Sequence, residues 1–142
     1  MAGKLVGKLV KRDCFSLKKD DSLLSASKAM DQYNIGAMPV INQNNTVIGI
    51  ISERDIARQI SEKNFRTDIK VEELMTKDVI SCDLNISVSE LMETMTTNKI
   101  RHMLIMDKQK LLGVVSIGDV VSHIIEQYKE ENENLRNYIN NF

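Results

Sequence analysis

The sequence predicts a mixed α/β (α+β) fold in which two β-α-β-β-α units pack with pseudo-two-fold symmetry and a helical tail follows. First, "GIISERDIAR" at 49–58 and "GVVSIGDVVS" at 113–122 share one pattern of Gly, two β-branched residues, Ser, Asp and an apolar run. Second, residues upstream repeat at an offset of 65, as Met30 and Met95 do. Third, the offset changes to 64 only in a polar turn, where a deletion is tolerated.

Each unit is expected to begin with a short strand, at 13–17 and 78–82, followed by a helix. The helices, "SLLSASKAMDQYN" and "SVSELMETMTTNK", carry apolar residues at helical spacing, and the second opens with Ser87 and Glu90 at the spacing of a capping box. Two short apolar strands joined by a tight turn come next, and a closing helix starts at a Ser. The expected boundaries are 4–62 for the first unit, 63–70 for a polar linker, 71–128 for the second unit and 129–142 for the tail.

The composition favours an aliphatic core and disfavours nucleic acid as a partner. Hydrophobic residues make up 42% of the 142 residues but aromatic residues only 4%, so we expect Ile, Leu, Val and the eight Met to fill the core. A net charge of −1 disfavours binding by phosphate neutralisation. A local basic cluster is expected to be a solvated face, and it consists of Lys4, Lys8, Lys11, Arg12, Lys18 and Lys19.

The cysteines and the N-terminal stretch predict a cytoplasmic protein that does not bind a membrane. Cys14 and Cys82 lack C-x-x-C spacing and lie in apolar runs, so we expect two buried thiols in a reducing compartment. The N-terminus "MAGKLVGKLVKRD" lacks the apolar region of a signal peptide, and no stretch has the length of a membrane span.

The Ser-x-x-Asp pairs, Ser52 with Asp55 and Ser116 with Asp119, allow two interpretations. In one, Ser caps the first turn of a helix and Asp complements the helix dipole. In the other, Asp is too short to reach back to the cap amide, as the Glu of a capping box does, and its carboxylate is left to accept from a vicinal diol such as ribose. The amide groups of the helix start would suit phosphate oxygens. Ribose and phosphate together indicate a nucleotide.

With these residues in register, the chain resembles the cystathionine-β-synthase (CBS) domain, and its tandem arrangement resembles the CBS pair called a Bateman module. The resemblance rests on the two Gly-to-Asp patterns and on "IGAMPVI" and "IRHMLIM" at equal distances upstream, and it covers about residues 4–128. Two positions depart from the family pattern. Leu104 stands where Pro is usual, and Arg54 replaces a small or apolar residue before the Asp.

The resemblance implies that two symmetry-related clefts bind adenosine compounds, with Asp55 and Asp119 holding the ribose hydroxyls. It implies AMP, ADP or ATP as a regulatory ligand, with NAD or S-adenosylmethionine as further possibilities and no catalytic cofactor. Phosphate or adenine contacts are expected from Ser52, Ser116, Arg101, His102, Ala37, Met38, Pro39, Ser16, Ser81 and Arg54. If one cleft alone is filled, we expect it to be that of Asp119, because Arg101 and His102 lie in the second unit.

Catalysis and metal binding are not expected. The chain has no G-x-S-x-G, P-loop or G-x-G-x-x-G motif, and its paired Asp residues suggest two equivalent binding sites rather than one acid/base pair. No group of Cys, His, Asp and Glu has zinc spacing. We expect His123 to be structural and a stripe of methionines to be core filler, namely Met92, Met95, Met103 and Met106.

The C-terminal stretch "HIIEQYKEENENLRNYINNF" predicts a helix longer than a small domain can cover. Its apolar side chains recur at spacings of three and four residues, interrupted by Glu131 and Asn132. We therefore expect this face to meet another subunit. The resembling family forms flat dimers of four repeats, which also implies a homodimer.

The sequence thus favours a regulatory sensor that binds an adenine nucleotide between its repeats and modulates an unidentified partner protein. Two alternatives stay open. The chain could be an interaction scaffold with empty clefts, in which Ser and Asp only cap helices. It could also couple an adenosine-type ligand to single-stranded nucleic acid through the basic cluster.

Overall fold

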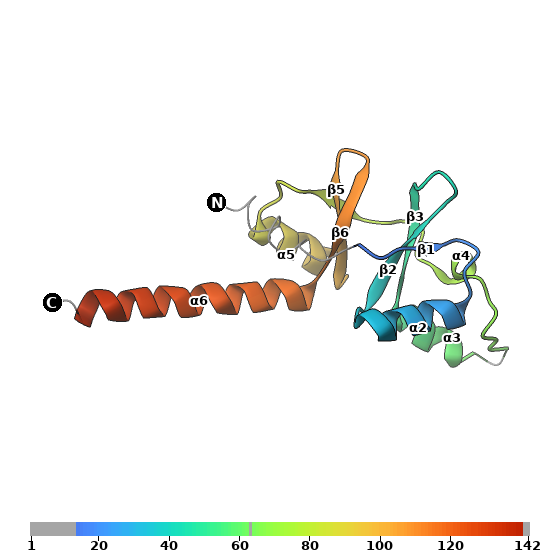
Figure 1. Cartoon of the computed structure of the whole chain (residues 1–142), viewed down its shortest axis with the longest axis horizontal. Coiled ribbons are helices and arrows are strands. Elements are labelled where there is room, and N and C mark those ends of the chain that lie inside the picture. Colours follow the sequence, from blue (N-terminus) through green and yellow to red (C-terminus); the bar gives the residue numbers. More distant parts are fainter. Residues whose placement is uncertain (1–13, 63, 141–142) are drawn as a thin grey trace.

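The computed structural model describes residues 14–62 and 64–140 and confirms two β-α-β-β-α units with a C-terminal helix (Figure 1). The first unit contains β1 (Leu17–Lys18), α2 (Leu23–Tyr33), β2 (Ala37–Ile41), β3 (Val47–Ser52) and α3 (Glu53–Ile60). A short helix that the sequence analysis missed, α4 (Val71–Leu74), leads into the second unit. That unit contains β4 (Ser81–Asp83), α5 (Val88–Thr97), β5 (His102–Asp107), β6 (Lys110–Ser116) and α6 (Ile117–Asn140).

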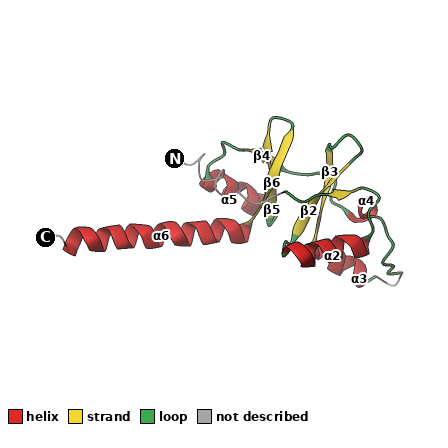
Figure 2. Cartoon of the chain, in the orientation of Figure 1, coloured by secondary structure: helices red, strands yellow, loops and turns green. Residues whose placement is uncertain are grey.

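Each unit forms its own three-stranded sheet, in the order β1-β2-β3 or β4-β5-β6 (Figure 2). The first strand of each sheet runs parallel to the second, which pairs antiparallel with the third. Both hairpins shift register at the same place, between Val40 and Ile41 and between Ile105 and Met106. The first strands are shorter and begin later than predicted, because parallel pairing starts only where Leu17 meets Val40 and Ser81 meets Leu104.

The first helix of each unit begins at a serine cap, as the Ser-rich starts indicate. Ser22 Oγ accepts a hydrogen bond from the Ser25 amide, and Ser87 Oγ accepts one from the Glu90 amide, both at 3.1 Å. Both helices are followed by a left-handed residue, at Asn34 (φ 53°) and Lys99 (φ 54°). These equivalent turns bring the chain back toward the sheet, and the second carries Lys99 to the site described below.

The two aliphatic cores predicted from composition are present, one beside each sheet. Met30 and Met38 are buried in the first core, and their repeat partners Met95 and Met103 are buried in the second. The first core also includes Val71, which is 0% exposed although the repeat register assigns it to the second unit. The start of one unit in sequence therefore completes the core of the other.

The segment before and through α4 is tied to the first unit by backbone hydrogen bonds. The Leu23 amide donates to the Ile69 carbonyl at 2.7 Å, and the Val71 amide donates to the Asp21 carbonyl at 2.8 Å. Farther on, Thr76 exchanges two backbone hydrogen bonds with Ile50 of β3, at 2.8 and 3.0 Å. This pairing places the residues after Thr76 along the edge of β3.

The prediction of two buried thiols is wrong for Cys14, which is exposed because it precedes the point where β1 enters the core. Cys82 is half-buried, and its thiol donates weakly to the Leu104 carbonyl at 3.7 Å. Burial, with a smaller contribution from Asp83, raises the pKa of Cys82 to about 11. This thiol therefore stays protonated at neutral pH.

Most of the basic cluster, namely Lys4, Lys8, Lys11 and Arg12, lies outside the described residues, whereas Lys18 is exposed and Lys19 is half-buried. Throughout residues 14–62 and 64–140, none of the helices combines the length and apolar character that a membrane crossing requires.

Gly49 is required where Thr76 approaches β3, and its replacement by Ala should destabilise the fold. A Cβ at this position would lie 2.9 Å from the Thr76 carbonyl oxygen and 2.5 Å from Met75 Sδ. We expect Gly49→Ala to lower the free energy of unfolding by about 1–3 kcal/mol, measured by urea denaturation.

The matched control is Gly118→Ala in α6, where a Cβ would meet Ser116 Oγ at an ordinary 3.6 Å. Helix propensity predicts a gain of about 0.5–1 kcal/mol there. Equal urea midpoints for the wild type and Gly49→Ala would show that the approach of Thr76 to β3 does not require glycine at position 49.

Candidate functional site

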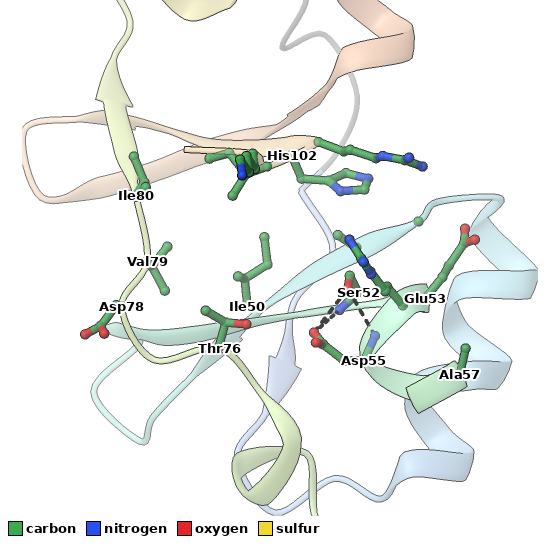
Figure 3. Close-up of a pocket in the computed structure, with 16 residues that line it drawn as sticks. Ile50, Ser52, Glu53, Asp55, Ala57, Thr76, Asp78, Val79, Ile80 and His102 are labelled. Carbon is green, nitrogen blue, oxygen red and sulfur yellow. Dashed lines mark hydrogen bonds between the residues drawn. The ribbon is translucent and has the colours of Figure 1, made fainter. Parts of the chain in front are cut away.

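A cavity of about 760 Å³ lies between the two units, in the size range of pockets for small molecules. Its walls come from both units and from the segment that follows α4 (Figure 3). The first unit contributes Gly36, Ala37, Ile50, Ser52, Glu53, Arg54, Asp55 and Ala57. The segment after α4 contributes Thr76, Asp78, Val79 and Ile80, and the approach to β5 contributes Lys99, Ile100, Arg101 and His102.

Asp55 is held in this cavity by reciprocal hydrogen bonds with Ser52 at the junction of β3 and α3. Asp55 Oδ2 accepts from the Ser52 amide at 2.9 Å and from Ser52 Oγ at 3.1 Å, while the Asp55 amide donates to Ser52 Oγ at 3.3 Å. Figure 3 shows these bonds as dashed lines. The expectation that Asp is too short to complete a capping box is therefore wrong. Ser52 keeps the extended backbone of β3 (φ −119°, ψ 164°), and its amide is within reach of the shorter side chain.

Capping leaves Asp55 able to bind a ligand, because Oδ2 receives both hydrogen bonds from Ser52. Among the described residues, none donates to Asp55 Oδ1. Each carboxylate oxygen can accept from about two donors. The cap therefore fixes the orientation of the carboxylate and leaves an acceptor for a hydroxyl group in the cavity.

The second Ser-x-x-Asp pair has the same local geometry. The Ser116 amide donates to Asp119 Oδ2 at 3.0 Å, and the Asp119 amide donates to Ser116 Oγ at 3.1 Å. Residues 76–80 form one wall of the first cavity. In the repeat register, residues 11–15 are the equivalent segment for a second cavity. Residues 11–13 lie outside the described residues.

Arg101 and His102 line the cavity of Asp55, whereas the sequence analysis associated them with Asp119. The two units face each other, and the start of β5 points across toward α3 (Figure 3). At Gly36 a Cβ would lie 2.9 Å from Glu53 Oε1 and 3.2 Å from His102 Nε2. The absence of a side chain at Gly36 thus lets Glu53 and His102 approach each other across the two units.

His102 has an altered titration because of its position between the units. Burial lowers its pKa below the ordinary value, and the nearby Arg101 guanidinium acts in the same direction. The carboxylates of Glu53 and Asp119 oppose this shift. His102 is therefore neutral at neutral pH in the empty site and could gain a proton when an anion arrives.

Several residues predicted from the sequence lie elsewhere. Met38 is 1% exposed and packs in the first core, and Pro39 pairs with Ile50 in the sheet without lining the cavity. Ser16 and Ser81 are exposed and also lie outside it. Among the described residues, no group of three or more His, Cys, Asp and Glu could hold a metal ion.

The sequence did not predict the part of the cavity wall formed by Thr76, Asp78, Val79 and Ile80, nor the contributions of Glu53 and Lys99. One signal was available, because Asp78 repeats Asp13 at the same offset as the residues of the core. That repetition indicates an equivalent position in both units. The contact with β3, however, arises because α4, which belongs to the second unit in the repeat register, packs on the first unit.

Comparison with known proteins identifies the family. The sequence model of the CBS-domain family matches residues 6–62 and 71–126 of this chain. The mitochondrial CBS domain-containing protein CBSX3 of Arabidopsis thaliana is 35% identical over 84% of this chain and 61% of its own length. An uncharacterized 17.7 kDa protein of Acidianus ambivalens is 33% identical over 85% of this chain and 73% of its own.

Solved structures agree with this assignment. A CBS-domain containing protein from Agrobacterium tumefaciens superimposes with a TM-score of 0.78 at 31% identity, over 86% of this chain and 91% of that one. The CBS domain pair of protein MJ0100, crystallised with methylthioadenosine and S-adenosyl-L-methionine, shares the fold, with a TM-score of 0.79 at 21% identity over 86% of this chain and 96% of that one. The chain belongs to the CBS-domain family and carries two CBS domains in tandem.

Proposed function

We propose that this CBS pair is a non-catalytic regulatory module that binds an adenosine-containing nucleotide of the AMP, ADP or ATP class in the cavity around Asp55. One observation supports this proposal above all. The Asp55 carboxylate, which its hydrogen bonds with Ser52 hold in place, lines the same cavity as Arg54, Lys99 and Arg101. The carboxylate suits the ribose hydroxyls, and the cations suit phosphate oxygens. The adenosine ligands of the MJ0100 pair are consistent with this proposal.

The phosphate part of the proposal rests on the charges that line the cavity. Three cationic side chains line it together with His102, namely Arg54 of α3, Lys99 after α5 and Arg101 just before β5. The carboxylates of Glu53, Asp55 and Asp78 also line it. A guanidinium binds phosphate oxygens in a bidentate manner. The guanidinium groups of Arg54 and Arg101 suit the phosphate of a nucleotide, and we propose the site of Asp55, which they line, as the first to fill.

Regulation would follow from the fact that both domains line one cavity. A nucleotide bound there would contact α3 of the first domain and the start of β5 in the second. A ligand shifts a conformational equilibrium by its differential affinity for the two states. A relative packing of the domains that suits the nucleotide would therefore be favoured, and the surface offered to a partner protein would change. The cytoplasmic location, the homodimer and the partner stay predictions from the sequence.

A ligand-free scaffold is the second candidate, and the complete cap at Asp55 favours it. Because Asp55 and Ser52 satisfy each other, the Ser-x-x-Asp pattern has a structural role even in an empty cavity. The substitution Asp55→Asn distinguishes the two candidates, since an Asn oxygen can still accept from the Ser52 amide but carries no charge.

Binding of adenosine compounds should depend on the charge of Asp55. We expect AMP, ADP or ATP at about 100 times its Kd to stabilise the protein by roughly 2.7 kcal/mol in thermal unfolding. Asp55→Asn should weaken binding by about 10- to 100-fold in calorimetry, because a hydrogen bond to a charged group contributes about 1.5–3 kcal/mol. NAD, S-adenosylmethionine and adenosine complete the panel.

Asp119→Asn is the matched control, since it changes the same cap in the second domain. We expect it to weaken binding much less than Asp55→Asn does, because Asp119 does not line this cavity and acts on it through the pKa of His102. If Asp55→Asn binds the nucleotide as the wild type does, Asp55 does not hold the ribose. If no adenosine compound raises the melting temperature, the ligand-free scaffold is favoured.

Nucleotide affinity should also depend on the protonation of His102. The bound phosphate favours the imidazolium form, so the pKa of His102 is higher in the complex than in the empty site, where burial lowers it. Binding then takes up a proton, and affinity rises as the pH falls. Each unit by which the pKa rises on binding contributes up to about tenfold.

The measurement compares the wild type with His102→Gln between pH 8 and pH 6, because the ratio of their affinities cancels the titration of the phosphate itself. We expect this ratio to increase toward pH 6 with ADP and to stay constant with adenosine. A constant ratio with ADP would show that His102 does not contact the phosphates.

A further inference from the structure

A second cavity, of about 340 Å³, adjoins the cavity of Asp55 and shares two lining residues with it, Gly36 and Glu53. Its lining comes from α2, from the turn that follows α2 and from α3, all in the first domain. Its volume falls within the range of pockets for small molecules. A ligand in the cavity of Asp55 could therefore extend past Gly36 and Glu53 into a second binding space.

The two cavities meet at the end of the first one that lies away from its apolar wall. Figure 3 shows Val79 and Ile80 on one side of Asp55 and Glu53 on the other. The Glu53 amide donates to the Gly36 carbonyl at 2.9 Å, which holds the start of α3 beside this glycine. A nucleotide with its base against the apolar wall and its ribose at Asp55 would direct its phosphates toward Gly36 and Glu53, where the second cavity begins.

The second cavity offers hydrogen-bond acceptors, and none of the described residues that line it is a cation. Its polar side chains are those of Ser27, Asp31, Asn34 and Glu53. Among the described residues, none donates a hydrogen bond to the side chain of Asp31 or Glu53, and none forms an ion pair with it. Carboxylates accept hydrogen bonds from hydroxyl groups and repel further negative charge. This lining therefore suits a sugar or a cation and disfavours another phosphate.

The second domain shows that the fold does not require these carboxylates. In the repeat register, the positions of the two acidic residues and of the glycine are occupied by residues without a carboxylate, namely Thr96, Ile117 and Arg101. The turn is the same in both domains, because the Ile117 amide donates to the Arg101 carbonyl at 2.9 Å, as the Glu53 amide does to that of Gly36. The acidic lining of the first domain thus indicates a role other than folding.

We propose that the ligand is a nucleotide whose pyrophosphate carries a second ribosyl group, and that this group binds in the second cavity at Asp31 and Glu53. The inference rests on the proposed function, because the adenosine half of the ligand occupies the cavity of Asp55. ADP-ribose and the nicotinamide dinucleotides have this chemistry. Their second pair of vicinal hydroxyls can donate to the two carboxylates, and the positive nicotinamide ring of NAD⁺ adds complementary charge. The third phosphate of ATP would instead meet like charge.

Calorimetry of the full chain with ADP, ATP and ADP-ribose tests the class of ligand. We expect ADP-ribose to bind at least about tenfold more tightly than ADP, because hydrogen bonds to charged groups contribute at least this factor. ATP should bind no more tightly than ADP. If neither ADP nor ADP-ribose binds, the proposed function itself fails, and this inference fails with it. If ADP binds and ADP-ribose binds no more tightly than ADP or ATP, the inference alone is overturned.

Asp31→Asn tests where the second ribosyl group lies. Asp31 is exposed and does not line the cavity of Asp55, so the free variant should keep its melting temperature. We expect the affinity for ADP-ribose to fall by about tenfold and the affinity for ADP to stay unchanged. The matched control is Glu62→Gln, which removes a carboxylate of the same domain outside both cavities and should change neither affinity. An equal effect of Asp31→Asn on both ligands, or no effect on either, would overturn the placement.

Glu53→Gln should have effects of opposite sign on the two longer ligands. Loss of this charge should weaken ADP-ribose and strengthen ATP, both relative to ADP, because the carboxylate that accepts from the ribosyl hydroxyls also repels a third phosphate. A shift of both ratios in the same direction would contradict the position of Glu53 between the pyrophosphate and the second ribosyl group.

Discussion

The reciprocal hydrogen bonds between Ser and Asp at the end of the third strand are the interaction on which the rest of the structure depends. They end β3 at Ser52, start α3 at the next residue and fix the Asp55 carboxylate at the cavity. The same bonds join β6 to α6 through Ser116 and Asp119. Because the cap uses Oδ2 of Asp55, its structural role and its proposed role toward a ribose do not compete. One short motif can therefore serve both the fold and a binding site.

The packing of α4 on the first domain adds a further wall beside this local motif, so that segments distant in the sequence line one cavity. Val71 packs in the core of the first domain, and Thr76 pairs with Ile50, so residues 76–80 form a wall beside β3. Gly49 permits this approach because a side chain there would meet the Thr76 carbonyl. Gly49 is thus explained by its contact with the segment that follows α4, as well as by its place in a strand.

Charged and titratable side chains of both domains influence one another across the cavity. His102 from the second domain lies near Glu53 of the first and Asp119 of its own, and burial keeps its pKa low. An anion placed between Arg54 and Arg101 would change the balance of charge on both sides at once. This arrangement gives the proposed regulation a physical basis, because a ligand would act on the contact between domains.

The sequence by itself determined the repeated units, the order of their elements, the aliphatic core and the length of the last helix. These features follow from local patterns, namely the spacing of apolar residues, the serine caps and the offset between Met30 and Met95. Only the tertiary structure decided that Arg101 and His102 lie beside Asp55 rather than Asp119, that α4 crosses to the first domain, and that Asp55 completes its own cap. The reason is that periodicity reports which face of an element is buried, whereas the pairing of elements between two similar units depends on packing between residues distant in the chain.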